Sequence, residues 1–259
     1  MHHKKNSYDY DETNSLINED SPPSYFDSVT AEDLKNNPIQ KNRRYTFIRK
    51  VYFILCIQLA FTSGICGLFI YNDTIKNFVQ GPNGGALLIS SFVLQLVFML
   101  VLVCTDVHRK YPYNYIILSL FTISMSYMLG VVTSTYDTNT VLLAAGATGV
   151  VTLGLTLFAF QTKIDFTGTG PYLFSGLLIL IFMGFMGMFI HDRIYDIIYA
   201  GLGAFIFSFY IIYDTQLIIG GKHKKYQFRT DEHVFAALNL YLDIINLFLY
   251  LLRLLSDRR

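Results

Sequence analysis

Seven long apolar runs, separated by short polar segments, follow a polar N-terminal stretch in this sequence. The runs lie near residues 50–71, 86–104, 113–133, 140–160, 172–190, 195–219 and 233–255. At 1.5 Å per residue, about 20 helical residues cross the ~30 Å hydrocarbon core of a bilayer. The pattern therefore predicts an all-α polytopic membrane protein, with seven transmembrane helices in one domain over 45–259.

Residues 1–44 have a different pattern, with many charged and few aliphatic residues. Such a segment buries too little apolar surface to offset the entropy lost on ordering, so we expect a disordered tail. Within it, Pro22, Pro23 and Tyr25 form a P-P-x-Y motif. Paired prolines favour the polyproline II conformation that WW domains bind. The motif predicts a WW-domain partner, such as a ubiquitin ligase, although the same residues also occur together by chance.

Composition agrees with a membrane protein and narrows its partners. The chain of 259 residues is 53% hydrophobic and 15% charged, with a mean hydropathy of +0.39 and a formal net charge of +1. Because it lacks a large basic cluster, we expect no nucleic-acid partner, and membrane lipid is its expected surrounding. Cys56, Cys66 and Cys104 lack metal-binding or redox spacing, so we expect buried thiols and no bound cofactor.

Basic residues alternate between successive loops and predict the topology. The basic segments are the one before the first run and the loops at 105–112, 161–171 and 220–232. By the positive-inside rule, these loops and the N-terminus face the cytosol. Seven crossings then place the C-terminus on the opposite side, whereas a last run that enters and returns as a re-entrant hairpin would keep it in the cytosol. The sequence favours the full span.

Two acids interrupt the last two apolar runs. Asp243 lies near the middle of its run and Asp214 near the end of the preceding one. A carboxylate in hydrocarbon costs at least ~2.5 kcal/mol, so such residues are usually paired, protonated or beside water. Asn239 and Asn246 lie four residues before and three residues after Asp243, on the same helical face. We expect both amides to support the acid.

The two acids are expected to meet. Consecutive spans joined by a short loop pack antiparallel, which places Asp214 and Asp243 at similar depth on neighbouring helices. Two adjacent carboxyl groups in a low-dielectric site cannot both ionise cheaply, so we expect them to share a proton and titrate together. The pair is compatible with a cation site, a proton-controlled latch, an aspartyl-protease dyad, or a hydrogen bond that only locks the two helices together.

The sequences around these acids resemble a known family. Residues 235–252 (FAALNLYLDIINLFLYLL) resemble the last helix of the Bax inhibitor-1 or transmembrane BAX inhibitor motif family, and residues 210–216 (YIIYDTQ) resemble the preceding helix. Residues 47–59 (FIRKVYFILCIQL) and 107–115 (VHRKYPYNY) resemble more narrowly its Lifeguard branch. The similarity covers about 45–255, and a cellular and a virus-encoded member are both compatible with it.

This resemblance implies a seven-helix fold with the last helix central. It implies a pH-sensitive calcium leak channel that restrains apoptosis alongside apoptosis-related membrane proteins, in the Golgi or endoplasmic reticulum or, alternatively, the plasma membrane. The family's two acids form a proton-sensitive latch, so by position Asp214 and Asp243 inherit pH sensing and transient calcium binding. Bacterial members also have an arginine at the end of the second helix, and here His108 or Arg109 would take that place.

Two other functions stay open. A non-conducting anti-apoptotic protein would act only through its tail and its lipid-buried surface. An intramembrane aspartyl protease would use the same two acids. A resemblance to such proteases would require a G-x-G-D motif at the second acid and a later P-A-L motif. Here Leu240, Tyr241 and Leu242 precede Asp243, and no P-A-L follows. We therefore do not expect an enzyme.

Overall fold

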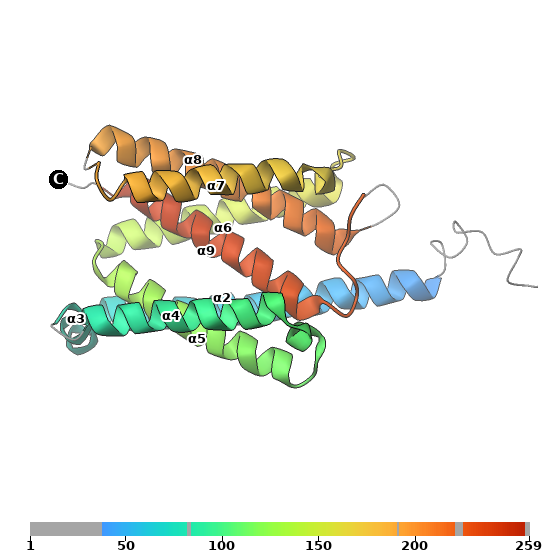
Figure 1. Cartoon of the computed structure of the whole chain (residues 1–259), viewed down its shortest axis with the longest axis horizontal. Helices are drawn as coiled ribbons and strands as arrows, with labels where there is room; N and C mark the ends of the chain where they lie inside the picture. Colours follow the sequence, from blue (N-terminus) through green and yellow to red (C-terminus); the bar gives the residue numbers. More distant parts are fainter. Residues whose placement is uncertain (1–37, 82–83, 191, 221–224, 257–259) are drawn as a thin grey trace, which may run out of the picture. The chain divides into compact units, whose positions relative to one another are not determined.

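The computed structural model describes residues 38–81, 84–190, 192–220 and 225–256, and helices account for most of them (Figure 1). Within these ranges there is no strand. The elements are α2 (Pro38–Tyr71), α3 (Asp73–Gln80), α4 (Gly84–Cys104), η1 (Asp106–Arg109), α5 (Tyr113–Ser134), α6 (Thr138–Gln161), η2 (Thr167–Thr169), α7 (Gly170–Met186), α8 (Arg193–Ile219) and α9 (His233–Leu255).

Seven of these helices are long and apolar enough to cross a membrane, which confirms the predicted fold class. They are α2 and α4 to α9, and their bounds match the predicted runs within a few residues except at the start of α2. Residues 38–44, expected to belong to the disordered tail, are helical. Pro38 suits the first position of a helix, because the N–H that it lacks would have no partner there. The motif of Pro22, Pro23 and Tyr25 lies outside the described residues.

The short helix α3 was not predicted. Asn72 caps its start, because the Asn72 side chain accepts hydrogen bonds from the backbone N–H groups of Thr74 and Ile75, at 3.0 and 3.2 Å. Asp73 adds a negative charge in the first turn, where the helix dipole favours it. The loop between the first two spans is therefore partly helical.

Helix α9 is the central helix, as predicted. In Figure 1 it runs obliquely between α4 and α5 on one side and α6, α7 and α8 on the other. Of its most apolar stretch 61% is buried, against 6% for α7, whose side chains are mostly outside the core. Because α9 is one unbroken helix from His233 to Leu255, it contains no chain reversal, and the re-entrant alternative is wrong.

The loops predicted to share the cytosolic side lie at one end of the helix bundle. Arg44 near the start of α2 donates hydrogen bonds to the carbonyl oxygens of Leu217, Ile219 and Phe228, at 2.6, 3.0 and 2.5 Å. These carbonyls belong to the end of α8 and the segment that follows it. The Arg44 guanidinium therefore satisfies helix-end carbonyls that have no partner within the helix.

Gly220 is required where α8 ends beside Arg44. Its φ of +60° lies in the left-handed region, which side chains other than glycine rarely adopt. A Cβ atom there would also lie 2.3 Å from Oε1 of Gln227 and 2.4 Å from Nη2 of Arg44. Glycine therefore allows the chain to turn while the arginine stays close to the backbone.

The cysteines correct one expectation. Cys66 is buried, but Cys56 and Cys104 are exposed. Both lie on outward faces of membrane-length helices, where a weakly polar thiol is compatible with lipid as well as with a protein core.

Candidate functional site

The two acids of the last helices meet inside the bundle. Asp214 on α8 and Asp243 on α9 are each only 5% exposed, and their side chains are hydrogen-bonded to each other. At least one of two hydrogen-bonded carboxyl groups must carry a proton, because a carboxylate can only accept. The structure therefore brings the two acids together, and the proton that they share stays a prediction.

The last turns of α8 fix the position of Asp214. Two residues along, the fully buried Gln216 donates from Nε2 to the carbonyl oxygen of Ile164 at 2.9 Å. Its Oε1 accepts the backbone N–H of Phe166 at 2.8 Å. Gln216 thus binds the end of α8 to the segment between α6 and α7, and its neighbour Asp214 is held on a well-packed turn.

Several buried oxygen atoms of α2, α8 and α9 make no hydrogen bond to the described residues. They include the second carboxyl oxygen of Asp243, the hydroxyl of Thr215 and the hydroxyl of Tyr52 on α2. The Tyr52 hydroxyl lies near those of Thr215 and Thr156, without a well-formed hydrogen bond to either. Buried polar atoms usually have partners, so this region is a place where water or a cation would be stabilised. We call Asp214, its sequence neighbour Thr215 and Asp243 the acid seam.

The acid seam offers oxygen atoms only, which suits a hard cation such as calcium. Two carboxyl groups are few for a resident ion, since calcium takes 6–8 oxygen ligands. Among the described residues, no group of three or more His, Cys, Asp or Glu side chains is placed to hold a metal.

The two asparagines expected to support Asp243 do not bond to it in the structure. The Asn246 amide donates to the carbonyl oxygen of Leu242, in its own helix, at 2.8 Å. Asn239 is partly buried, and among the described residues no hydrogen bond connects it to either acid. Sharing a helical face with Asp243 was not sufficient, because a helix carbonyl was nearer to the Asn246 amide than a carboxyl group.

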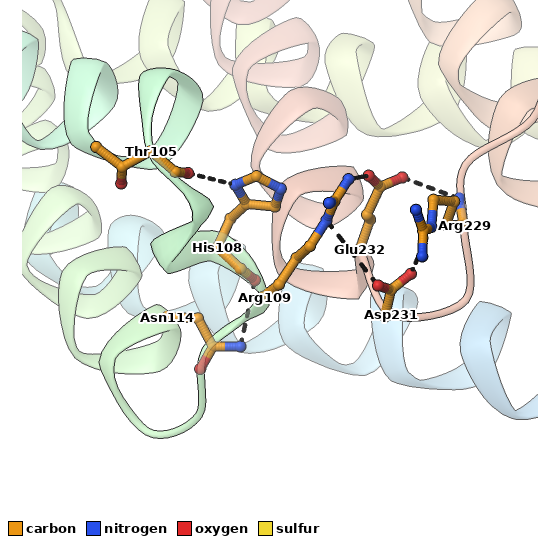
Figure 2. Close-up of polar contacts among 7 residues, drawn as sticks. All are labelled: Thr105, His108, Arg109, Asn114, Arg229, Asp231 and Glu232. Atoms are coloured by element: carbon orange, nitrogen blue, oxygen red, sulfur yellow. Dashed lines mark hydrogen bonds and ion pairs between the residues drawn. The ribbon is translucent and has the colours of Figure 1, made fainter.

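His108 and Arg109 are also elsewhere (Figure 2). Arg109 forms ion pairs with Asp231 and Glu232, which immediately precede α9. Glu232 and Asp243 are separated by 11 residues, or ~16 Å along the helix axis. The His108 ring is hydrogen-bonded through Nδ1 to the carbonyl oxygen of Thr105 at 2.8 Å. These contacts of His108 and Arg109 do not include Asp214 or Asp243, so they do not provide the predicted support of the acids.

The contacts of Arg109 instead fasten η1 to the start of α9. Figure 2 shows that Arg229 completes the group: its side chain pairs with Asp231 at 3.3 Å and its backbone N–H donates to Glu232 at 2.9 Å. These side chains are partly exposed, so each ion pair contributes modestly, up to about 1 kcal/mol. The cluster positions the entrance of the central helix.

A second buried polar group was missed by the sequence analysis. Thr62 on α2 shares hydrogen bonds with Ser126 on α5, at 2.9 Å, and with Tyr241 on α9, at 2.8 Å. One helical turn away, Gln58 donates to Thr122 at 2.9 Å. All five side chains are buried and none carries a charge. We call Gln58, Thr62, Thr122, Ser126 and Tyr241 the neutral seam.

Comparison with known proteins gives a consistent result over most of the chain. The model of the family described as "Inhibitor of apoptosis-promoting Bax1" matches residues 44–259. Protein lifeguard 3 of Homo sapiens is 36% identical over 219 residues, which cover 83% of this chain and 70% of that protein. The Golgi anti-apoptotic protein of vaccinia virus (strain Lister) is 40% identical over 216 residues, covering 82% of this chain and 86% of that protein.

Proposed function

The chain belongs to the Bax inhibitor-1 family, whose model matches it from residue 44 to residue 259, and on that premise we propose that it restrains apoptosis as a calcium leak channel of intracellular membranes. The Asp214–Asp243 pair is its pH-sensitive gate. The observation that carries the proposal is a hydrogen-bonded pair of buried acids between the central helix and α8, next to oxygen atoms without partners.

The gate works through one shared proton. With the proton present, the hydrogen bond between the acids holds α8 and α9 together. Loss of the proton leaves two negative charges, and unit charges ~4 Å apart repel by about 4 kcal/mol at an effective dielectric near 20. A difference of that size shifts a two-state helix packing by a factor of roughly hundreds. Rising pH therefore loosens the contact and favours the conducting state.

The same change attracts the permeant ion. Two carboxylates provide hard oxygen ligands, which calcium prefers, and the unpartnered hydroxyl of Thr215 belongs to the residue next to Asp214. Too few ligands are present for tight binding, so the ion is released again. Fast conduction requires this combination of attraction and release.

Calcium flux in proteoliposomes, measured against pH with purified protein as the only variable, tests the proposal. Wild-type flux should rise with pH. Asp243→Asn keeps a hydrogen bond to its partner and removes the repulsion, so flux should fall and lose its pH dependence. Asp214→Asn should also flatten the profile, and the double variant should add little, because interacting residues are not additive.

Asp137→Asn is the matched control. Asp137 is exposed, precedes α6 and makes no capping hydrogen bond through its side chain, so its loss changes the charge without touching the pair. It should retain the wild-type profile. If both single variants of the acid pair also retain that profile, the two acids only lock the helices together.

A non-conducting anti-apoptotic protein is the second candidate. The viral relative is named Golgi anti-apoptotic protein, and neither that name nor Protein lifeguard 3 refers to ion transport. For this candidate, flux through liposomes that contain the protein would equal flux through empty liposomes at every pH. The same flux assay therefore separates the two functions.

The proposed location is the Golgi or endoplasmic reticulum membrane, with the N-terminus in the cytosol. The name of the viral relatives favours the Golgi, and the basic loops gathered at one end of the bundle favour this orientation. A cysteine placed at residue 226 should react with a membrane-impermeant thiol reagent from the cytosol, in a background without exposed cysteines. A cysteine placed at residue 137 should react only from the lumen, and labelling of residue 137 from the cytosol would overturn the orientation.

A further inference from the structure

An apolar groove of about 460 Å³ lies between α2 and α5, away from the acid seam. Its size falls within the range of roughly 300–1,000 Å³ that is usual for small-ligand sites. The lining residues are Lys50, Phe53, Ile54, Ile57, Gln58, Phe61, Tyr115, Leu118, Ser119, Thr122 and Ile123. Most of these side chains are apolar, and none of them is acidic.

The groove opens towards the lipid. Phe53, Ile57 and Phe61 on its α2 side are 69%, 54% and 43% exposed, as expected of side chains that face hydrocarbon. From Lys50 to Phe61 the helix advances 11 residues, or about 17 Å, close to half of the ~30 Å hydrocarbon thickness. The groove therefore has the length of one lipid leaflet.

One end of the groove is positively charged. Lys50 lies at this end, close enough to His233 for an electrostatic interaction, and within the described residues it forms no ion pair with a carboxylate. Tyr115 lies beside it, and the Tyr115 hydroxyl is hydrogen-bonded to Nε2 of His233 at 2.9 Å. This is the end of the bundle that carries Arg44 and Arg109. A cation and a hydroxyl at headgroup depth are suited to a phosphate.

The floor of the groove presents little polar surface to an acyl chain, although the buried Oε1 of Gln58 makes no hydrogen bond to the described residues. Its main polar side chains, Gln58 and Thr122, are hydrogen-bonded to each other at 2.9 Å and are only 4% and 5% exposed. Ser119 donates to the carbonyl oxygen of Tyr115 at 2.8 Å, within its own helix. An acyl chain lying over this floor would mainly contact Phe53, Ile57 and Ile123.

We propose that this groove binds a phospholipid with an anionic headgroup, whose phosphate contacts Lys50 and Tyr115 and whose acyl chain lies along the aromatic and aliphatic side chains of α2 and α5. The charge at one end, the apolar length of one leaflet and the opening towards lipid together favour this occupant. The proposal depends on the groove alone and does not require that the protein conduct ions.

The absence of tryptophan from the sequence allows a clean test. Ile57→Trp places a single tryptophan in the groove, and Leu178→Trp places one on α7. Leu178 is 50% exposed and lies eight residues after the start of α7. Both variants are reconstituted in phosphatidylcholine vesicles containing a small fraction of brominated phosphatidic acid or brominated phosphatidylcholine. Bromine quenches tryptophan on contact, so quenching reports which lipid occupies each place.

At residue 57, brominated phosphatidic acid should reach half-maximal quenching at an approximately fivefold lower lipid fraction than brominated phosphatidylcholine. This factor corresponds to the ~1 kcal/mol that one lysine contributes near an anionic headgroup. At residue 178 the two lipids should quench equally. Lys50→Gln should abolish the preference, whereas Lys110→Gln, at the same end but outside the groove, should keep it. Circular dichroism verifies that each variant is helical.

Each other outcome identifies a different occupant. Equal quenching by the two lipids at residue 57 would mean that the groove has no headgroup preference, and the proposal would be wrong. Weaker quenching at residue 57 than at residue 178 by both lipids would mean that protein, such as a second copy of the chain, covers the groove. Loss of the preference when inorganic phosphate is added would indicate a free-phosphate site instead of a lipid site.

Discussion

The acid seam and the neutral seam both place polar side chains inside the bundle, and both use α9, yet they are built differently. In the neutral seam, Thr62 has two side-chain partners on two other helices. In the acid seam, the second oxygen of Asp243 and the hydroxyl of Thr215 have none among the described residues. A largely satisfied neutral network stabilises one packing, whereas an incompletely satisfied charged one allows a change of packing.

One helix carries both seams because of its periodicity. Tyr241 and Asp243 are two residues apart, which is slightly more than half a turn of an α-helix, so they point in nearly opposite directions. Tyr241 faces α2 and α5, where its ring also lies edge-on to Phe121 at 6.4 Å. Asp243 faces α8. Under the proposed gating mechanism, the central helix is held firmly on one face while the contact on the other responds to pH.

The difference between the seams is also one of magnitude. Hydrogen bonds between membrane helices contribute on average about 0.6 kcal/mol each and do not depend on pH when both partners are neutral. Repulsion between two buried carboxylates is several times larger and appears only when the shared proton is lost. Variants of the acid seam should therefore change the pH dependence of calcium flux, whereas variants of the neutral seam should change only the stability, and by less.

The largest effect is expected from Asp243→Leu. Leucine removes the hydrogen bond to Asp214 and leaves a buried carboxyl group without its partner, which costs about 1–3 kcal/mol. The variant should unfold at a lower temperature in detergent than the wild type, and its calcium flux should not depend on pH. Thermal unfolding followed by circular dichroism measures the first effect and the proteoliposome assay measures the second.

Asp243→Asn is the matched control for that loss of stability. Its amide keeps a hydrogen bond to Asp214, so it should unfold within about 1 kcal/mol of the wild type while still showing flux without pH dependence. If Asn and Leu at this position were equally destabilising, the hydrogen bond between the acids would not be what holds α8 to α9.

The spans and the acid pair were predictable because each leaves a strong signal in the sequence. An apolar run of membrane length has few alternative structures, and a carboxyl group inside it is costly enough to require a reason. The start of α3 also has a signal in the sequence, because asparagine is a preferred N-cap residue and aspartate is favoured in the first turn of a helix. The prediction of a loop did not take this signal into account.

The partners of long or amide side chains were not predictable. Arg109 reaches Glu232, 123 residues away in sequence, because the long arginine side chain pairs with whichever acid the fold brings near. In the sequence, Arg44 is one of several basic residues before the first apolar run, and nothing there indicates that it binds the carbonyl oxygens at the end of α8. Threonine and serine are common in membrane helices, and their hydroxyls often bond to their own helix, so the sequence did not reveal which of them form the neutral seam.

The smallest effects are expected in the neutral seam. Tyr241→Phe removes one hydrogen bond but leaves Thr62 bonded to Ser126, so it should cost about 0.6 kcal/mol. Thr62→Val removes both bonds and should cost about 1–2 kcal/mol, because the Tyr241 hydroxyl then loses its partner. Neither variant should change the pH at which calcium flux rises, because threonine does not titrate and the ordinary pKa of tyrosine, about 10, is far from neutral pH.

The double variant isolates the contact between these two residues. If Thr62 and Tyr241 act through their shared hydrogen bond, Thr62→Val combined with Tyr241→Phe should cost less than the two single losses added together, because the bond can be removed only once. Thermal unfolding of the four proteins measures this coupling, and flux against pH accompanies it. A shift of the flux profile in any of them would mean that the two faces of α9 are coupled, and that the neutral seam takes part in gating rather than only in packing.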